Sequence, residues 1–193
     1  HDMGLIAFHL MPTLLGASQV VMDTGLFIRR PGLWLDKVHQ HRATVLCAPN
    51  FGLQFFLANH RSPTPPSWDL SAVRLLFNAA EPISAQVCDR FLERLAPHGL
   101  AKTCMATCYG LAEATVAVSF PIPEQEFTRL AARPASLAPG SLVEEVPPGT
   151  PGSLTLVEEG PPIPGCQVRV SHQGRDLGQG RVGRIQIKGQ NVT

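Results

Sequence analysis

The sequence predicts an α/β fold in which helices flank a parallel sheet, followed by the start of a β-rich part. Two observations lead to this prediction. Within residues 1–119, short apolar segments of strand character alternate with segments whose apolar side chains recur at helical spacing. Strands separated by helices are typical of parallel sheets with right-handed crossovers. Within residues 161–193 the apolar side chains instead alternate with period two, which is typical of antiparallel strands.

The N-terminal part of the chain holds helices and short strands in alternation. We expect a buried helix over residues 4–15, which Pro12 can end early, and then a strand over 19–22. A second helix begins near Pro31 and keeps Leu33, Trp34, Val38 and His41 at helical spacing. A strand over 44–47 and a helix over 51–57 follow. Residues 61–67 contain three prolines and are expected to form a loop.

The next segment repeats the strand–helix–strand pattern more clearly. A strand over residues 73–77 leads into the loop 78–82, and a strand over 103–107 leads into Tyr109. Between them lies a helix with Val87, Phe91 and Leu95 on one stripe and Gly99 after its end.

Three loops follow the expected parallel strands, over residues 48–50, 78–82 and 109–113. The carboxyl ends of parallel strands meet at one edge of a sheet, and ligands bind beyond that edge. We therefore expect the three loops to converge on one rim and to form a ligand site there.

The second half of the chain reads differently. Residues 120–160 are rich in proline, carry several acidic residues and show little periodicity, so they are expected to form a long, mobile loop or insertion. Residues 167–170 and 182–188 alternate around a glycine-rich turn and predict an antiparallel hairpin within residues 161–193. Residues 178–183 fit the dinucleotide fingerprint G-x-G-x-x-G. That motif requires a helix after it, whereas these residues lead into a strand, so we do not expect a dinucleotide site here.

Composition argues against several classes of function. The formal net charge is +1, and without a basic stripe neither nucleic acid nor an anionic membrane is expected as a partner. No apolar run reaches the length of a membrane span, and no signal peptide opens the sequence. The five cysteines lack zinc-ligand spacing and indicate reduced thiols in a cytoplasmic protein. Because the sequence starts at His1 and stops at Thr193 within an unfinished strand pattern, we expect both ends to be cuts through a longer protein.

Other motifs receive a structural interpretation. His39 and His41 lie two residues apart on an expected helix and point in different directions, so we expect a solvated face there and not a metal site. No G-x-S-x-G elbow is present, so covalent hydrolysis lacks its nucleophile. Residues 191–193 read Asn-Val-Thr, a glycosylation sequon that we expect to be idle without a secretory signal.

Tyr109 and Glu113 stand out as candidate binding residues. An aromatic ring can stack on a planar base, and a carboxylate four residues later can hold a hard cation such as Mg²⁺ through oxygen. This arrangement predicts a site for a nucleotide with its metal ion. Tyr-Gly followed by an acid is also common in ordinary loops, so a purely structural loop stays open as the alternative.

Four ordered motifs resemble those of a known superfamily. They are His1-Asp2-Met3-Gly4, Asn78-Ala79-Ala80-Glu81-Pro82, Cys108-Tyr109-Gly110-Leu111-Ala112-Glu113-Ala114-Thr115, and Pro162-Ile163-Pro164-Gly165 followed by Val182-Gly183-Arg184-Ile185. Together they resemble the adenylate-forming enzymes, which include acyl-CoA synthetases, peptide-synthetase adenylation domains and luciferases. Within that superfamily the chain is most similar to fatty acyl-AMP ligases, such as the loading modules of hybrid polyketide and peptide synthetases. The resemblance implies the middle part of the large N-terminal domain.

The resemblance also implies roles for individual residues. Tyr109 would stack on adenine, and Glu113 would coordinate the Mg²⁺ that bridges the ATP phosphates. His1 and Asp2 would lie near the acyl carboxylate and the α-phosphate as catalytic residues, although His1 can equally be a frayed terminus. The remaining nucleotide-binding positions implied are Asn78, Ala79, Ala80, Glu81, Pro82, Cys108, Gly110, Leu111 and Ala112. Gly110 would let the backbone approach the nucleotide closely.

Two departures from the family pattern are visible. The family usually has glycine where Ala79 stands, which would narrow the base pocket, and glutamate where Arg184 stands. The family's glycine-rich phosphate loop would precede His1, and its ribose-binding aspartate, hinge and catalytic lysine would follow Thr193. We therefore expect that this chain alone does not adenylate a substrate.

The resemblance implies an enzyme that uses ATP and Mg²⁺ to convert a fatty acid into acyl-adenylate and pyrophosphate. The acyl group would then pass to an acyl carrier protein, or to CoA in the alternative reading as an acyl-CoA synthetase, with help from the C-terminal domain of the same longer chain. A non-catalytic nucleotide-binding module and a structural interaction domain remain open as further alternatives. The stretch between the Tyr-Gly and Pro-x-Pro-Gly motifs resembles the insertion specific to the ligases.

Overall fold

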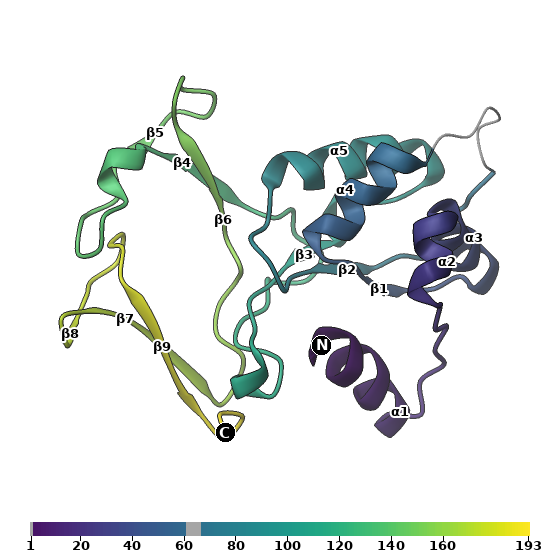
Figure 1. Ribbon diagram of the computed structural model, residues 1–193, viewed down its shortest axis with the longest axis horizontal. Coiled ribbons are helices and arrows are strands. Elements are labelled where there is room, and N and C mark those ends of the chain that lie inside the picture. Colours follow the sequence, from purple (N-terminus) through teal and green to yellow (C-terminus); the bar gives the residue numbers. More distant parts are fainter. Residues whose placement is uncertain (1, 61–66) are drawn as a thin grey trace.

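The computed structural model describes residues 2–60 and 67–193, which form an α/β part and a β-rich part (Figure 1). The α/β part contains a three-stranded parallel sheet in the order β1-β2-β3, formed by Val45–Cys47, Leu75–Asn78 and Met105–Thr107. Strands β1 and β2 are joined through α4 (Asn50–Asn59), and β2 and β3 through α5 (Ala85–Leu95). The expected parallel sheet with flanking helices is thus present.

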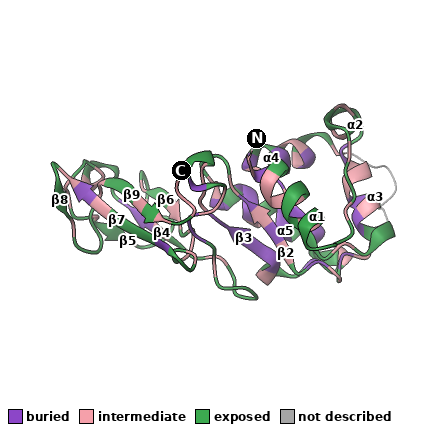
Figure 2. Cartoon of the chain, turned by 90° about the horizontal axis from the view of Figure 1, so that it is seen from below, coloured by how far each residue is buried: buried purple, intermediate pink, exposed green. Residues whose placement is uncertain are grey.

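Helices α4 and α5 cover one face of the sheet and enclose the main core (Figures 1 and 2). On the central strand β2, the side chains of Leu76 and Asn78 are fully buried on this face. Helix α5 begins with Ser84 as its N-cap, whose hydroxyl accepts a hydrogen bond from Val87 N–H at 3.4 Å. The core consists of apolar side chains from the strands and from α3, α4 and α5, chiefly Leu35, Leu46, Leu53, Phe56, Leu76, Phe91, Leu95 and Met105.

The opposite face of the sheet is partly covered by the N-terminal helix. This helix is π-helical over Met3–Leu10 and continues as α1 over Met11–Leu14. Its Phe8 ring meets the Phe77 ring of β2 edge-on, with centroids 5.6 Å apart. Pro12 stands in the first turn of α1, a position at which proline is tolerated.

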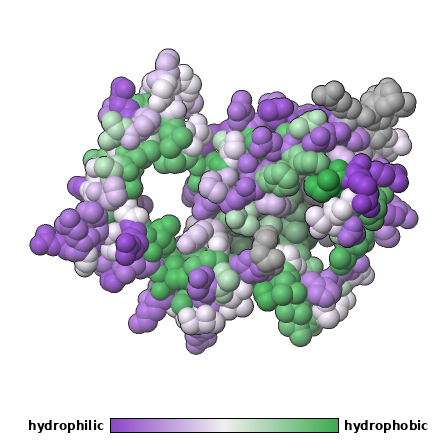
Figure 3. Space-filling view, viewed as in Figure 1, coloured by the Kyte–Doolittle hydropathy of each residue, from purple (hydrophilic) through white to green (hydrophobic). Residues whose placement is uncertain are grey.

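The prediction that residues 4–15 are buried is wrong. Of the described residues in this helix only Met3 is buried, and Leu14 and Leu15 expose 85% and 78% of their surface. Hydrophobic colour accordingly covers the helix surface in Figure 3. An apolar run indicates that a segment tends to be buried, but it does not say what buries it. The described residues pack against one side of this helix and leave its other side exposed.

The segment between this helix and β1 also differs from expectation. Residues 19–22 form no strand, and the helix α2 (Thr24–Arg29) follows them. The carboxylate of Asp23 caps α2 by accepting a hydrogen bond from Leu26 N–H at 3.1 Å. The expected helix after Pro31 is present as α3 (Gly32–His41). Of the expected loop 61–67, residues 61–66 lie outside the described residues.

The expectation of a long loop over residues 120–160 is corrected, whereas the alternative of an insertion stays a prediction. These residues form a three-stranded antiparallel sheet in the order β5-β4-β6, from Glu145–Val146, Arg129–Ala132 and Leu154–Val157. The prolines that obscure this pattern lie before, between or after the strands, for example Pro134 in the 3-10 turn Pro134–Ser136. Proline is tolerated at such positions because no ladder hydrogen bond needs its N–H group.

The β-rich part ends in a second antiparallel sheet, ordered β8-β7-β9, from Arg175–Asp176, Cys166–His172 and Arg184–Gly189. The expected pairing of residues 167–170 with the later strand is present, and β8 adds a tight hairpin within the connection. Residues 178–183 carry no helix, as expected. The two small sheets lie at the left of Figure 1, and Figure 3 shows an opening between them.

Short 3-10 turns cover Ala96–His98, Lys102–Cys104 and Ala112–Ala114. Among residues 2–60 and 67–193, no helix is both long enough and apolar enough to cross a lipid bilayer.

Candidate nucleotide site at the carboxyl edge of the sheet

The three loops that follow β1, β2 and β3 lie side by side, as the sequence predicts. Ala48 N–H, just after β1, donates to the carbonyl oxygen of Phe77 at 3.0 Å. Cys108 N–H, just after β3, donates to the carbonyl oxygen of Asn78 at 3.1 Å. The backbone pairing therefore continues one residue beyond β1 and one residue beyond β3, so the three loops emerge at one rim.

A pair of side chains joins the first two loops reciprocally. The Asn50 side-chain oxygen accepts a hydrogen bond from Ser84 N–H at 3.0 Å, at the start of α5. The Glu81 carboxylate accepts a hydrogen bond from Phe51 N–H at 2.5 Å, in the first turn of α4. A carboxylate at a helix N-terminus satisfies an orphan donor and complements the helix dipole. Glu81 thus has a clear structural partner, and only its backbone is left to line the rim.

The Asn78 side chain points into the core and away from the rim. Its side-chain nitrogen donates to the Cys88 sulfur of α5 at 3.3 Å, and its side-chain oxygen has no hydrogen-bond partner among the described residues. Asn78 is fully buried. Any contact between Asn78 and a ligand at this rim has to involve the backbone.

The turn after Asn78 is strained. Ala79 is half-buried, whereas Ala80 and Pro82 are exposed. Ala80 has a φ of 74°, in the left-handed region that favours glycine. Non-glycine residues are held there only where the surrounding structure enforces it, and such positions are enriched at binding sites. Here the Glu81 and Ser84 hydrogen bonds after Ala80, and the bond that the Asn78 carbonyl oxygen accepts from Cys108 N–H before it, provide that enforcement.

Tyr109 stands at the start of the third loop, directly after buried Cys108. Its ring is half-buried and packs against a small apolar cluster of Ala114, Val118 and Cys166, so one end of β7 supports it from behind. Its carbonyl oxygen accepts hydrogen bonds from Val118 and Ser119 N–H, both at 3.0 Å. These bonds fix the backbone that carries the ring.

Gly110 is required for a reason that differs from the expected one. A Cβ atom at this position would lie 1.8 Å from the carbonyl oxygen of Val116, far inside contact distance. The close approach that excludes a side chain is therefore made by the chain itself. The expected approach of the Gly110 backbone to a nucleotide stays a prediction.

Glu113 lies in the 3-10 turn Ala112–Ala114, which Leu111 precedes. Its side chain is exposed and makes no hydrogen bond or ion pair with any residue that the structure describes. The described residues contain no cluster of three or more His, Cys, Asp or Glu that could enclose a metal ion. Mg²⁺ is commonly held by one or two carboxylates together with substrate phosphates, and an available single carboxylate fits that mode.

The structure adds contacts that the sequence did not indicate. The segment after β9 folds back on the turn of Glu113, and Thr193 N–H donates to the carbonyl oxygen of Glu113 at 2.9 Å. The C-terminus accordingly lies beside the short teal turn after β3 in Figure 1. Of the two expected catalytic residues, His1 lies outside the described residues, and Asp2 is half-buried at the start of the N-terminal helix.

The cysteines near the rim are not nucleophiles at neutral pH. Burial raises the pKa of the Cys47 thiol to about 11, and burial raises that of Cys108 to about 12. The same cause raises the pKa of Cys88, on α5, to about 11. These thiols are protonated at neutral pH, and the thiolate is the reactive form.

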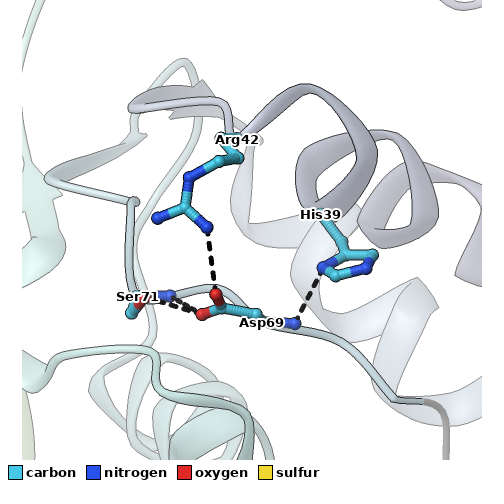
Figure 4. Close-up of polar contacts among 4 residues, drawn as sticks. All are labelled: His39, Arg42, Asp69 and Ser71. Atoms are coloured by element: carbon cyan, nitrogen blue, oxygen red, sulfur yellow. Dashed lines mark hydrogen bonds and ion pairs between the residues drawn. The ribbon is translucent and has the colours of Figure 1, made fainter.

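A polar cluster near the amino ends of β1 and β2 contains serine, histidine and aspartate, but these side chains are not in a catalytic arrangement (Figure 4). The Ser71 hydroxyl and N–H both donate to the Asp69 carboxylate, at 2.6 and 3.0 Å, and Arg42 lies 3.1 Å from it. These bonds, led by that of the Ser71 hydroxyl, lower the pKa of Asp69 to about 2. His39 Nδ1 accepts from Asp69 N–H at 3.0 Å. The histidine is thus bonded to backbone and not to the serine, so the cluster is a structural turn.

The whole chain, residues 1–193, matches the family model described as AMP-binding enzyme. Among the relatives, a 4-hydroxyphenylalkanoate adenylyltransferase of Mycobacterium tuberculosis is 32% identical over 193 residues, which are 100% of this chain and 31% of that protein. A long-chain-fatty-acid–AMP ligase of Mycolicibacterium smegmatis is 34% identical, over 100% of this chain and 31% of that protein.

Solved structures agree with this match. A fatty acid AMP ligase from Legionella pneumophila superposes with a TM-score of 0.93 at 29% identity, over 100% of this chain and 33% of that chain. An adenylation domain of a keto acid-selecting NRPS module, bound to keto acyl adenylate, gives 0.90 at 33% identity, over 100% and 35%. The chain thus spans about a third of the length of these relatives. The fold expected from the sequence is confirmed, and the chain belongs to the AMP-binding enzyme family.

Proposed function

We propose that this chain is the central part of the large N-terminal domain of a fatty acyl-AMP ligase. The observation that carries the proposal is the position of Tyr109 and Glu113 on the third of three loops at the carboxyl rim of a parallel sheet. That rim is where α/β sheets bind ligands. The chain belongs to a family named for binding AMP, and its relatives include ligases that join fatty acids to AMP.

The proposed reaction has two steps. A carboxylate oxygen of the fatty acid attacks the α-phosphorus of ATP, the bond from that phosphorus to the bridging oxygen breaks, and pyrophosphate leaves. The product is an acyl-adenylate. The thiol of an acyl carrier protein then loses its proton to solvent, its sulfur bonds to the acyl carbon, the bond from that carbon to the AMP oxygen breaks, and AMP leaves. In this proposal the protein is cytoplasmic, and the C-terminal domain of the same longer chain assists the reaction.

Each rim residue has a proposed part in the first step. The Tyr109 ring stacks on adenine, and the backbone of residues 79–81 lines the base and the ribose. Glu113 holds Mg²⁺, and His1 and Asp2 lie near the reacting groups. A bound Mg²⁺ supplies neutralisation of the phosphate charge that builds up as the carboxylate attacks. The strained turn at Ala80 supports this assignment, because its shape is held by Glu81 before any ligand binds.

A carrier protein is proposed as acceptor in preference to CoA because of the sheet formed by β4, β5 and β6. Its Arg129 guanidinium makes a two-pronged ion pair with the Asp89 carboxylate of α5, one contact being 2.8 Å, and covers the Phe127 ring at 4.8 Å. An element held against the α/β part in this way would hinder the C-terminal domain from reaching the pose that delivers CoA. Even a bias of ~1.4 kcal/mol between two domain poses changes their ratio tenfold.

The proposal is tested with the full-length enzyme that contains this chain, by fatty acid-dependent exchange of labelled pyrophosphate into ATP. Glu113→Gln removes one charge at nearly constant shape, so exchange should fall ~100-fold or more. Glu93→Gln makes the same change at an exposed site near the far end of α5 and should leave exchange unchanged. Wild-type exchange in Glu113→Gln would remove Glu113 from the metal site.

The acyl substrate is tested in the same assay. A medium- or long-chain fatty acid, a 4-hydroxyphenylalkanoate and an α-keto acid are compared, since relatives named for each class are about equally similar to this chain. The proposal expects the fatty acid to support the fastest exchange. Exchange that depends on one of the other two acids alone would keep the adenylation chemistry and overturn the substrate class.

A further inference from the structure

The glycosylation sequon at residues 191–193 packs against the loop that carries Glu113 and is hydrogen-bonded to it. Asn191 follows β9, and its side-chain nitrogen donates to two carbonyl oxygens of that loop, Ala114 at 3.2 Å and Ala117 at 2.9 Å. Both N–H groups of the amide are thereby used. The residue is half-buried, so water competes little for these bonds.

Further hydrogen bonds run between the same two segments. The Thr115 hydroxyl donates to the carbonyl oxygen of Asn191 at 2.9 Å. Thr193 donates twice to the carbonyl oxygen of Glu113, from its N–H at 2.9 Å and from its hydroxyl at 3.3 Å. Residues within and just after the Glu113 turn are thus tied to one short segment that is distant in sequence.

The tied turn holds a conformation that the chain does not adopt readily by itself. Thr115 has a φ of 64° and a ψ of −44°, which is unfavourable for a β-branched residue. Such a conformation persists only where surrounding contacts impose it. The Asn191 amide bonds to carbonyl groups on both sides of Thr115, at positions 114 and 117, and is therefore placed to impose it.

We infer that Asn191 is a positioning residue for the Glu113 carboxylate. The inference rests on the proposed function, in which Glu113 holds Mg²⁺. Relaxation of Thr115 would turn the preceding residues and move the Glu113 side chain away from the rim. Asn191 itself does not touch the metal ion or the nucleotide; it acts through the backbone of the turn. The segment after β9 thereby links the β-rich part of the molecule to the proposed metal site.

The test is made in the full-length enzyme with Asn191→Asp. This substitution keeps the shape, removes both donors and sets a carboxylate against two carbonyl oxygens. The Mg²⁺ concentration that gives half-maximal pyrophosphate exchange should rise roughly 10- to 100-fold, the usual loss when a residue that orients a metal ligand is changed. Gln190→Glu makes the same chemical change at an exposed neighbour and should leave that concentration unchanged.

A second readout does not depend on activity. Backbone amides of residues 111–117 should exchange with deuterium faster in Asn191→Asp than in the wild type, while those of β2 stay protected. If wild-type enzyme shows no exchange of pyrophosphate, the proposed function fails, but the deuterium result still decides whether Asn191 holds the turn. If wild-type enzyme is active and Asn191→Asp changes neither the Mg²⁺ dependence nor the deuterium exchange, the positioning role is refuted.

Asn191→Ala covers the case in which the aspartate variant does not fold, because it removes the donors without adding charge. It should show the same two changes with a normal melting curve. Loss of folding in both variants would also overturn the inference, since Asn191 would then support the whole domain and not the Glu113 turn.

Discussion

Replacing Gly110 with alanine should distort the third loop of the rim. The new Cβ would lie 1.8 Å from the Val116 carbonyl oxygen. One of the two must move by roughly 1.5 Å, because a carbon and an oxygen in contact stay about 3.3 Å apart. The bonds that Val118 and Ser119 donate to Tyr109 lie in the same turn and would be strained or lost. At ~0.5–1.5 kcal/mol net for each, their loss lowers the free energy of unfolding by about 1–3 kcal/mol.

The functional effect of Gly110→Ala should be larger than its effect on stability. A displacement of ~1 Å at a positioning element can slow a reaction ~100-fold. We expect Gly110→Ala to slow pyrophosphate exchange ~100-fold and to lower the urea midpoint only modestly. Gly178→Ala is the matched control, because a Cβ at Gly178 meets no atom within 4 Å. Equal exchange rates and equal urea midpoints for Gly110→Ala and the wild type would refute the steric argument.

Two further predictions concern the sheet β4–β6 and the buried thiols. Arg129→Ala should raise acyl-CoA formation relative to adenylation, because the two-pronged ion pair with Asp89 is lost. Arg133→Ala is the control and should not change this ratio, because its partner Glu144 lies within the same sheet region. Equal product ratios in the two variants would show that this sheet does not influence the choice of acceptor. Because burial raises the thiol pKa values of Cys47 and Cys108 above the usual 9.0, to about 11 and about 12, their contribution to folding stability should be constant below about pH 9 and fall as pH rises toward these values. Urea midpoints between pH 8 and pH 11 measure this, and a flat profile would contradict it.

The sequence was sufficient where side-chain period and loop position carry the information. Strands β1, β2 and β3 and helices α3, α4 and α5 follow the expected order, because strand and helical spacing are local properties. The convergence of the three loops followed from the rule that parallel strands share one carboxyl edge. Local pattern and tertiary structure agree in this part of the chain.

The sequence was insufficient where structure depends on distant partners. The N-terminal helix is apolar but exposed, since burial depends on what packs against it and not on its own composition. The strands β4, β5 and β6 span two to four residues each, too few for a period to emerge among the surrounding prolines. Asn191 reads as a sequon, and only the folded chain brings it to a turn more than seventy residues away. The role of Gly110 in nucleotide binding stays a prediction, and its steric contact with Val116 could not be inferred from the sequence.

The most direct test of the proposed site is a crystal structure of the full-length enzyme with a hydrolysis-resistant acyl-adenylate analogue that carries a fatty acyl chain. We expect the purine ring to stack on Tyr109, with its edge beside the backbone of residues 79–81. With Mg²⁺ and an ATP analogue in place of the adenylate, the Glu113 carboxylate should be a metal ligand at ~2.0–2.1 Å. A nucleotide bound elsewhere, or a purine ring that does not contact Tyr109, would contradict the assignment of this rim as the nucleotide site.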